Sequence, residues 1–440
     1  MVERRFMVKK TTKKKQAARS PRKPPTPPTP DQTPTGGRNA GLFTAKNAKN
    51  DEFYTQWIDI EREMNAYLEY DPHVFKDKVV LLPCDDPEWS NFTKYFALHF
   101  MDLGIKKLIS TSFAPNSKPP EIPYQPTLFE QEAPQFDESR TRKHGKKFIL
   151  EAKDINEDGV INIVDLQWEY LEGDGDFRSN EITNLRDEAD IVVTNPPFSL
   201  FREFVAWIVE RDIKFVIIGN KNAITYKEVF PLIMRNEMWL GSTPMSLDMM
   251  FRVPEAVARE LEKTGKEGSK WRRVDGEVLA RASSVWFTNL DHGRRHEPLA
   301  LMTTADNLKH SKHKEVREIG YQVYDNYDAI EVSFTDAIPS DYKGVMGVPI
   351  SFLSKYNPDQ FEILGATQRG CHDAVPDTKK YDTYWEVRPD GTKTGSSGGK
   401  TNENANLEGN DGKKNYFANK EGHVVQSAYQ RIFIQRKVSP

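Results

Sequence analysis

Hydrophobic residues in the first half of the chain alternate between short apolar runs and stretches with helical spacing. The apolar runs predict strands at 78–82, 108–112, 148–152, 191–194 and 215–218. Apolar residues three and four positions apart predict helices at 51–70, 87–101, 199–209 and 226–235. Because strands and helices alternate at this spacing, we expect an α/β fold with a doubly wound, mostly parallel, Rossmann-like sheet.

The pattern changes after residue 241. Short aromatic runs at 285–287 and 331–334 predict further strands, which are mixed with basic loops. Residues 391–413 have low complexity and predict a mobile loop. We therefore expect a first domain at 41–241, with an excursion at 114–147 rich in Pro, Gln and charged residues. A second, α+β region should follow at 242–440.

The first 40 residues differ from the rest in charge. They hold eleven Lys and Arg against two acidic residues, a net charge of +9, so residues 41–440 sum to −12. Seven of the 28 prolines also lie here. Such a basic, Pro-rich tail cannot bury apolar surface and is expected to be disordered. A mobile cationic arm is attracted to phosphate backbones; the alternative is a leader that only increases solubility.

Composition excludes several classes of protein. The chain has 440 residues, of which 37% are hydrophobic, and no apolar stretch reaches the roughly 20 residues of a membrane helix. Cys84 and Cys371 are the only cysteines, which excludes a disulfide framework and a Cys-rich zinc site. These features predict a reducing, cytoplasmic setting without membrane contact.

The most informative motif is Asn195-Pro196-Pro197-Phe198, which directly follows the run Ile191-Val192-Val193. The strand must end here, because neither proline can donate a ladder hydrogen bond. The result is a stiff loop at the carboxyl end of a strand, where open α/β sheets bind ligands. An amide, rigid carbonyls and an aromatic ring suit the exocyclic amine of a planar base. The alternative is an ordinary Pro-rich turn.

Together with other stretches, this loop resembles the EcoRI-type modification methylases, which are S-adenosylmethionine-dependent adenine-N6 DNA methyltransferases. The resemblance implies a class I methyltransferase catalytic domain at 41–241 and a target-recognition, DNA-binding region at 242–440. It also implies double-stranded DNA and a cognate restriction endonuclease as partners. The stretches that carry it are 84–113, 176–179, 191–205, 215–233, 285–290 and 344–365.

In this family the loop would be catalytic. Hydrogen bonds from the amine to the Asn195 side chain and the Pro196 carbonyl would aim the nitrogen lone pair at the methyl group and stabilise developing charge. Pro197 stiffens the loop, and Phe198 would stack on the base. The adenine must be flipped out of the duplex to reach them.

The resemblance also implies residues that bind S-adenosylmethionine. Phe53, Tyr54 and Thr55 match the element that packs on the methionine part of the cofactor, although they also fit plain packing at a helix start. Asp85 and Asp86 stand where a Gly-rich loop is usual. They could accept hydrogen bonds from the α-amino group, or only cap a helix beginning at Pro87.

Asp174 and Asp176, within a Gly-Asp-Gly-Asp turn, are candidates to bind the adenine amine of the cofactor, and a solvated turn is the alternative. The strand at 108–112 ends in Ser and Thr without an acid, so ribose contacts are not assigned. Residues 154–165 fit a calcium-loop template with Asp165 in place of the usual Glu. A hairpin with an Asp-Gly turn explains them as well, and we assign no metal site.

Two other functions remain open at this stage. The motif Asn-Pro-Pro-aromatic also serves methyltransferases that act on RNA amines or protein amides. The missing Gly-x-Gly is consistent with an inactive methyltransferase fold that only binds DNA, whereas the intact Asn195–Phe198 loop argues against it. Arg294, Arg295 and the basic run 309–314 are possible phosphate contacts, or solvated loop charges.

Overall fold

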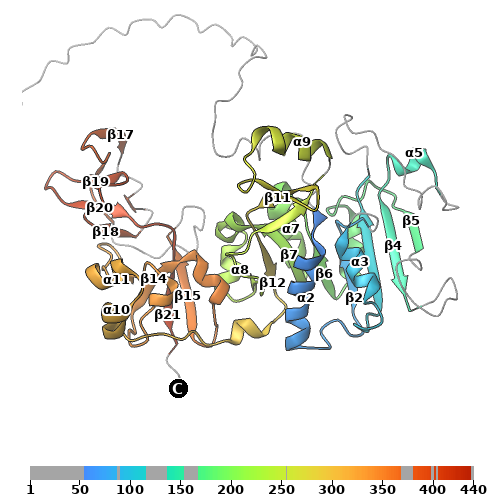
Figure 1. The fold of residues 1–440 in the computed structure, drawn as a ribbon, viewed down its shortest axis with the longest axis horizontal. Helices are drawn as coiled ribbons and strands as arrows, with labels where there is room; N and C mark the ends of the chain where they lie inside the picture. The colour runs from blue at the N-terminus through green and yellow to red at the C-terminus, as the bar shows by residue number, and fades with distance from the viewer. Residues whose placement is uncertain are drawn as a thin grey trace, which may run out of the picture. The chain divides into compact units, whose positions relative to one another are not determined.

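A computed structural model describes residues 54–86, 90–114, 136–152, 167–253, 255–367, 380–397, 401–402 and 405–437. Within these residues, eight strands form one large sheet in the order β5-β4-β3-β2-β6-β7-β12-β8 (Figure 1). They are β2 (Val79–Leu82), β3 (Lys107–Ser112), β4 (Lys146–Glu151), β5 (Gln167–Tyr170), β6 (Ile191–Thr194), β7 (Lys214–Asn220), β8 (Trp239–Leu240) and β12 (Ser284–Thr288). All five strands predicted in the first half are present.

The centre of the large sheet is parallel. Strands β3, β2, β6 and β7 pair in parallel in that order, whereas the strands at both ends join by antiparallel pairing. Strands β5 and β8 each follow two successive antiparallel pairings, so they run in the same direction as the parallel centre. Of these eight described strands, only β4 and β12 therefore run in the opposite direction. Most strands of the mixed sheet therefore point the same way, as predicted.

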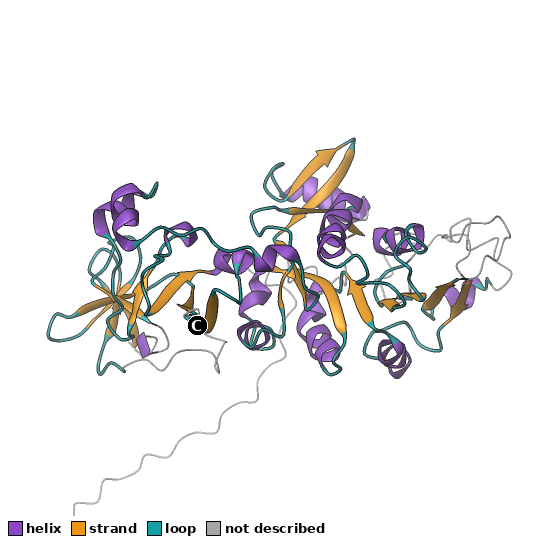
Figure 2. Cartoon of the chain, turned by 90° about the horizontal axis from the view of Figure 1, so that it is seen from below, coloured by secondary structure: helices purple, strands orange, loops and turns teal. Residues whose placement is uncertain are grey.

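Both faces of this sheet are buried, as a parallel sheet requires. Leu81, Val192 and Ile217 pack on one side, in a core shared with α6 (Asn180–Glu188) and α7 (Phe201–Val209). Their neighbours in sequence pack on the other side with α2 (Trp57–Tyr70) and α3 (Asn91–Leu98). Helices accordingly lie on both sides of the central strands (Figure 2).

All four predicted helices are shorter than expected, and three of them begin well after their predicted first residue. The helix predicted at 51–70 begins only at Trp57, because Tyr54–Thr55 form strand β1 and Gln56 keeps an extended backbone. The helix predicted at 226–235 is reduced to α8 (Phe230–Met234), which begins where Pro231 favours a first helical turn. Short 3-10 turns precede α7 and α8, at η3 (Phe198–Leu200) and η4 (Lys221–Thr225).

A second, smaller sheet has the order β1-β9-β11-β10. Strand β1 pairs with β9 (Met249–Arg252), β9 with β11 (Glu277–Ala282), and β11 with β10 (Trp271–Val274). Helix α9 (Glu255–Thr264) lies between β9 and β10 in sequence. Strand β9 thus pairs with β1, and strand β12 pairs with β7, although both β9 and β12 follow residue 241 in the chain.

The remaining described residues mix strands and short helices. One sheet has the order β13-β14-β21-β15 and another the order β17-β16-β19-β20-β18. Their strands are β13 (Ala329–Glu331), β14 (Val345–Pro349), β15 (Phe361–Ala366), β16 (Trp385–Val387), β17 (Lys393–Ser397), β18 (Asn406–Glu408), β19 (Tyr416–Ala418), β20 (Val424–Ser427) and β21 (Arg431–Arg436). The helical elements are η5 (Gly293–His296), α10 (Thr304–His310), α11 (Lys314–Ile319), η6 (Thr335–Ala337) and η7 (Ile350–Lys355).

The segment 391–413, predicted as a mobile loop, contains two strands. Strand β17 pairs with β16, and β18 pairs with β20. Polar side chains support the pairing. Thr394 Oγ1 donates a hydrogen bond to Glu386, and Ser427 Oγ donates one to Asn406, each with a donor–acceptor distance of 2.8 Å. Cross-strand hydrogen bonds that involve small polar residues thus override the low-complexity composition.

Several expectations concern residues outside the described ranges: the tail 1–40, Phe53, the calcium template 154–165 and residues 115–135 of the excursion. The rest of the excursion, 136–147, contains helix α5 (Glu138–Thr141) and the start of β4. Among the described helices, none combines the length and the hydropathy needed to cross a bilayer.

Candidate active site

The order of the central strands defines where a ligand can bind. From β2 the chain passes through α3 to β3 on one side, and from β6 through α7 to β7 on the other. The strand order therefore reverses between β2 and β6, and open α/β sheets bind ligands at the carboxyl ends of such a pair. Asp85 follows β2 and Asn195 follows β6, so both lie at this point.

Asp85 connects the two strand ends. One oxygen of its buried carboxylate accepts a hydrogen bond from Ser90 Oγ at 2.6 Å, and the other accepts one from Thr194 Oγ1 at 2.6 Å. Thr194 is the last residue of β6, directly before Asn195. The carboxylate thereby fixes the position at which the Asn195–Phe198 loop leaves the sheet.

The cap predicted for helix α3 is wrong. This helix begins at Asn91, with Ser90 as its N-cap, and Ser90 Oγ accepts the hydrogen bond of Phe92 N–H at 3.0 Å. The carbonyl oxygen of Asp86 accepts Ser90 N–H at 2.7 Å. A serine can reach the second helical N–H from the N-cap position, which Asp86 is too far away to do.

Hydroxyl groups hold the loop after β2 in place. Thr93 Oγ1 and Ser110 Oγ both donate to the carbonyl oxygen of Asp85, and Thr111 Oγ1 donates to that of Pro83. The Asp85 N–H donates to the Thr111 carbonyl at 3.0 Å. The Ser and Thr residues at the end of β3, which we had left without a role, therefore anchor the neighbouring loop.

The environment of Asp85 changes its acidity. Burial raises the pKa of its carboxyl from 3.8 to about 7, although the hydroxyls of Ser90 and Thr194 act in the opposite direction. Burial and the nearby Asp85 carboxylate also raise the pKa of the Cys84 thiol well above its ordinary value. Cys84 therefore stays protonated and is no nucleophile at neutral pH.

We expect Asp85→Asn to gain stability relative to the unaltered protein as the pH rises. An acid with a raised pKa in the folded state binds more protons than in the unfolded state between pH 3.8 and about 7, so folding becomes less favourable as the pH increases. The loss is about 1.4 kcal/mol per pH unit and about 4 kcal/mol over the window. Urea denaturation of both proteins from pH 4 to 8 measures this loss. A difference in unfolding free energy that does not change with pH would contradict the raised pKa of the buried Asp85 carboxyl.

The Asn195–Phe198 loop leads from the end of β6 into the 3-10 turn η3. Pro196 is buried, whereas Asn195, Pro197 and Phe198 are partly exposed. The carbonyl of Pro197 accepts Leu200 N–H at 2.9 Å, which closes the 3-10 turn η3. The Phe198 ring packs edge-on against Phe251 of β9, with 6.4 Å between the ring centroids. The catalytic roles of these four residues stay predictions.

The Gly-Asp-Gly-Asp turn lies against the end of β3. Gly175 has φ +86°, and a Cβ atom there would lie 2.2 Å from the carbonyl oxygen of Ser112. The carbonyl of Asp174 accepts Ala114 N–H at 2.8 Å, and its side chain accepts Asp176 N–H at 3.1 Å. Glycine is thus needed for close contact with the protein's own backbone.

Asp176 already has a strong partner. Its carboxylate binds the Arg178 guanidinium through two hydrogen bonds of 2.9 and 2.6 Å, and it also accepts Arg178 N–H at 2.9 Å. Its charge adds a small contribution to the raised pKa of Cys84, which follows β2. A cofactor amine would have to share this carboxylate with Arg178.

Strand β1 approaches the same end of the sheet. The carbonyl of Thr55 accepts Asn91 Nδ2 at 2.8 Å, so β1 is joined to the first residue of α3. Tyr54 and Thr55 also pair with Arg252 and Phe251 of β9. The structure thus groups the described candidate residues around the ends of β2, β3 and β6, namely Tyr54, Thr55, Asp85, Asp86, Asp174, Asp176 and Asn195–Phe198.

Other expectations are revised by the contacts. Arg295 is buried, with its guanidinium 3.7 Å from the centre of the Trp239 ring, and Arg294 Nη1 donates to the Ser242 carbonyl at 2.7 Å. Burial makes Arg295 unavailable as a phosphate contact, whereas Arg294 is partly exposed and its role as a phosphate contact stays a prediction. Sequence reasoning missed Ser90, Thr194 and Phe251, of which only Thr194 carried a signal, as a hydroxyl directly before the loop. No three His, Cys, Asp or Glu in the described ranges are grouped closely enough to hold a metal ion.

Comparison with known proteins agrees with this arrangement. The family model described as "Adenine-specific methyltransferase EcoRI" matches residues 41–437. Type II methyltransferase M.EcoRI of Escherichia coli is 43% identical over 329 residues, which cover 74% of this chain and 89% of the relative. Type II methyltransferase M.MpnI of Mycoplasma pneumoniae is 33% identical over 341 residues, which cover 77% and 89%. No solved structure gave a significant match.

The matched region contains the large sheet and every described candidate residue, which makes the chain a methyltransferase. It belongs to the adenine-specific EcoRI methyltransferase family.

Proposed function

We propose that this protein is a site-specific DNA adenine-N6 methyltransferase that takes its methyl group from S-adenosylmethionine and acts on an adenine flipped out of duplex DNA. The observation that carries the proposal is the Asn195–Phe198 loop at the reversal of strand order, held there by Thr194 and Asp85. The family description and the names of the relatives support adenine as the target.

The sheet supports a doubly wound, class I methyltransferase domain. Its parallel centre is covered by helices on both faces, and its crossovers α3 and α7 lie on opposite faces. Such a sheet offers one crevice at the carboxyl ends of its strands, where a nucleotide-like cofactor fits. The C-terminal α+β region would then contribute to recognition of the DNA sequence.

The reaction needs an aromatic amine, a weak nucleophile, to attack a methyl group. S-adenosylmethionine would supply that methyl group as a sulfonium. The side-chain oxygen of Asn195 and the carbonyl oxygen of Pro196 accept hydrogen bonds from the amine, which orients its lone pair and stabilises the positive charge that develops on nitrogen. Phe198 stacks on the base and holds it out of the duplex.

The residues present fit this cofactor by their chemistry. Carboxylates at Asp86, Asp174 and Asp176 suit the two amino groups of S-adenosylmethionine, and the aromatic ring of Tyr54 suits its apolar methylene groups. Asp85 accepts hydrogen bonds on both oxygens already, so its larger contribution is to position the loop.

Transfer of a labelled methyl group tests the proposal. The purified protein, incubated with labelled S-adenosylmethionine and mixed-sequence duplex DNA, should form N6-methyladenine, which mass spectrometry of the nucleosides identifies. RNA and a glutamine-containing peptide serve as competing substrates and should receive no label. Label in either of these but not in DNA would contradict the DNA assignment, and binding of DNA without any transfer would indicate an inactive fold. Methylation-sensitive sequencing of the product gives the recognition site.

A further inference from the structure

The segment between α9 and β10 carries basic side chains that the fold does not neutralise. Eight Lys and Arg residues lie between 252 and 281. Four arginines among them form ion pairs, namely Arg252 with Glu277, Arg259 with Glu255, Arg273 with Glu262 and Arg281 with Asp248. The other four, Lys263, Lys266, Lys270 and Arg272, are exposed and have no ion pair with a described residue. These four unneutralised cations fall within ten consecutive residues.

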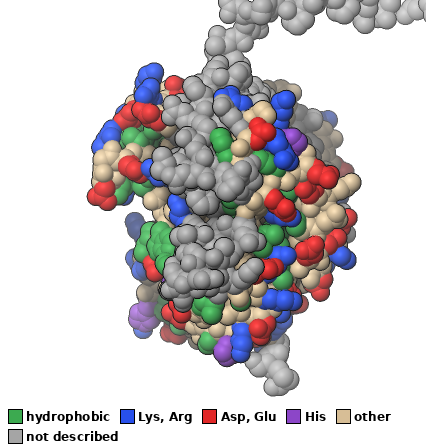
Figure 3. Space-filling view, turned by 90° about the vertical axis from the view of Figure 1, so that its right-hand side faces the viewer, with side chains coloured by type: hydrophobic (Ala, Val, Ile, Leu, Met, Phe, Trp, Pro, Cys, Tyr) green, Lys and Arg blue, Asp and Glu red, His purple; other side chains and the backbone are tan. Residues whose placement is uncertain are grey.

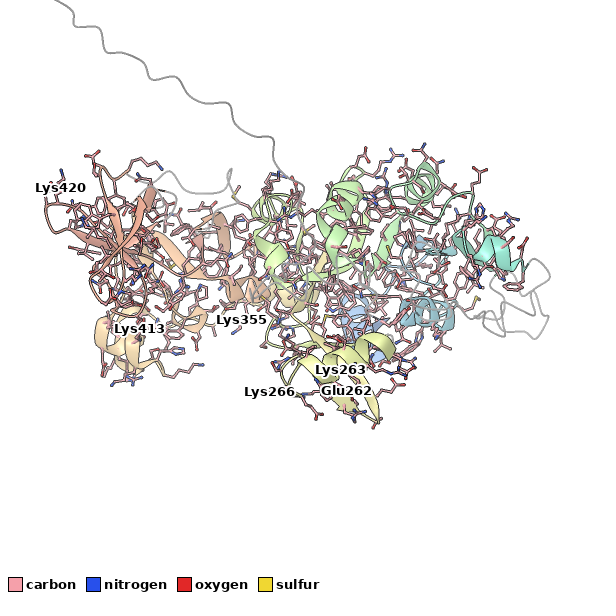
Figure 4. All side chains as sticks on the ribbon, turned by 90° about the horizontal axis from the view of Figure 1, so that it is seen from above. Glu262, Lys263, Lys266, Lys355, Lys413 and Lys420 are labelled. Carbon is pink, nitrogen blue, oxygen red and sulfur yellow. The ribbon has the colours of Figure 1, made fainter. Side chains whose placement is uncertain are left out.

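The fold holds this segment in a defined form. The buried Trp271 donates its Nε1–H to the Gly265 carbonyl at 3.0 Å, and its own carbonyl accepts Gly268 N–H at 2.8 Å. Trp271 thereby ties the end of α9 to the edge strand β10. The Arg273 side chain forms an ion pair with Glu262 and lies over the Trp271 ring. Successive side chains of a strand alternate between its two faces, so Arg272 lies on the opposite face of β10. Figure 4 shows Lys263 and Lys266 close together near Glu262.

The same small sheet reaches the catalytic loop. Strand β10 pairs with β11, β11 with β9, and Phe251 of β9 packs on Phe198. Strand β9 also pairs with Tyr54 and Thr55. The basic segment is therefore attached by continuous strand pairing to the residues that would receive the flipped adenine.

We propose that the segment Lys263–Arg272 binds the phosphate backbone of duplex DNA beside the target base. This inference rests on the proposed function and names a surface through which the enzyme would contact DNA. Residues 41–440 carry a net charge of −12, so attraction to DNA has to come from local groups of cations. Acidic and basic side chains are interspersed among the described residues on the face shown in Figure 3. Phosphate contacts fix orientation on the duplex without reading sequence, which suits a segment placed beside the catalytic loop.

Salt dependence of DNA binding tests this surface. The variant Lys263→Gln, Lys266→Gln, Arg272→Gln removes three of the cations. The matched control is Lys76→Gln, Lys106→Gln, Lys214→Gln, three exposed lysines at the amino ends of β2, β3 and β7, away from the carboxyl ends of these strands. Both variants lose three positive charges. Each lost phosphate contact lowers the slope of log K against log salt concentration by about 0.9, so we expect the first variant to lose about 3 from the slope and the control to lose none.

The outcomes separate this inference from the function it rests on. An unchanged slope in the first variant, or an equal loss in both variants, would overturn the proposed surface, while methyl transfer by the unaltered protein would still support the enzyme. Absence of both DNA binding and methyl transfer in the unaltered protein would overturn both proposals. Binding is measured with mixed-sequence duplex DNA and the full-length chain, because phosphate contacts do not depend on the recognition site.

Discussion

Asn195→Ala should reduce the rate of methyl transfer by about 10²- to 10³-fold, the cost of removing one preorganised polar group from a developing charge. The backbone of the loop should keep its position, because Thr194 remains bound to Asp85 and Pro196 and Pro197 remain in place. Affinity for DNA and for S-adenosylmethionine should therefore stay near that of the unaltered protein. Single-turnover transfer of labelled methyl, with separate binding titrations, measures each quantity.

Two further variants make this result specific. Asn195→Asp keeps an oxygen in the same place and should recover part of the rate lost in the alanine variant. Asn180→Ala makes the same truncation at the exposed first residue of α6 and should leave the rate unchanged. Full activity in Asn195→Ala would refute the role assigned to the amide.

Gly175→Ala should lower the unfolding free energy by about 2 to 5 kcal/mol. A non-glycine residue in this left-handed conformation costs about 1 to 2 kcal/mol. Its Cβ would lie 2.2 Å from the Ser112 carbonyl oxygen, and displacing packed backbone costs about 1 to 3 kcal/mol more. The displaced turn carries Asp174 and Asp176, so affinity for S-adenosylmethionine should also fall.

Gly173→Ala is the matched control, two residues away in the same turn. A Cβ at Gly173 meets no atom within 4 Å, and Gly173 lies outside the positive-φ positions of the described chain. It should change the unfolding free energy by less than about 0.5 kcal/mol. Equal urea midpoints for the two variants would show that the turn does not depend on its contact with Ser112.

Much of the sheet could be predicted because its signal is local. The strands at 79–82, 107–112 and 191–194 are short β-branched and apolar runs buried on both faces, and such runs differ from their surroundings within a few residues. The position of Asn195 at a strand end followed in the same way from two prolines. The catalytic role of the loop could not be derived from propensity and came from the resemblance to a family.

What could not be predicted depends on contacts between distant residues. Asp85 and Thr194 are 109 positions apart, and nothing near either residue reveals their hydrogen bond. Strand β1 has two residues and exists only because β9 pairs with it. The sequence offers several side-chain acceptors that could cap α3, and Asp86 was predicted as the cap. In the structure Ser90 is the residue directly before the helix and accepts the hydrogen bond. The need for glycine at position 175 also depends on a residue distant in sequence, because a Cβ there would collide with the carbonyl oxygen of Ser112.

The late insertion of β12 between β7 and β8 has a consequence for synthesis on the ribosome. Strand β8 has no partner other than β12 in the described sheet, and β1 has none other than β9. A nascent chain that has not yet emerged beyond Thr288 therefore exposes β7 as an open edge, which is a template for aggregation. The large sheet that carries Asn195 is therefore completed only after β12, which is translated well after Asn195 itself.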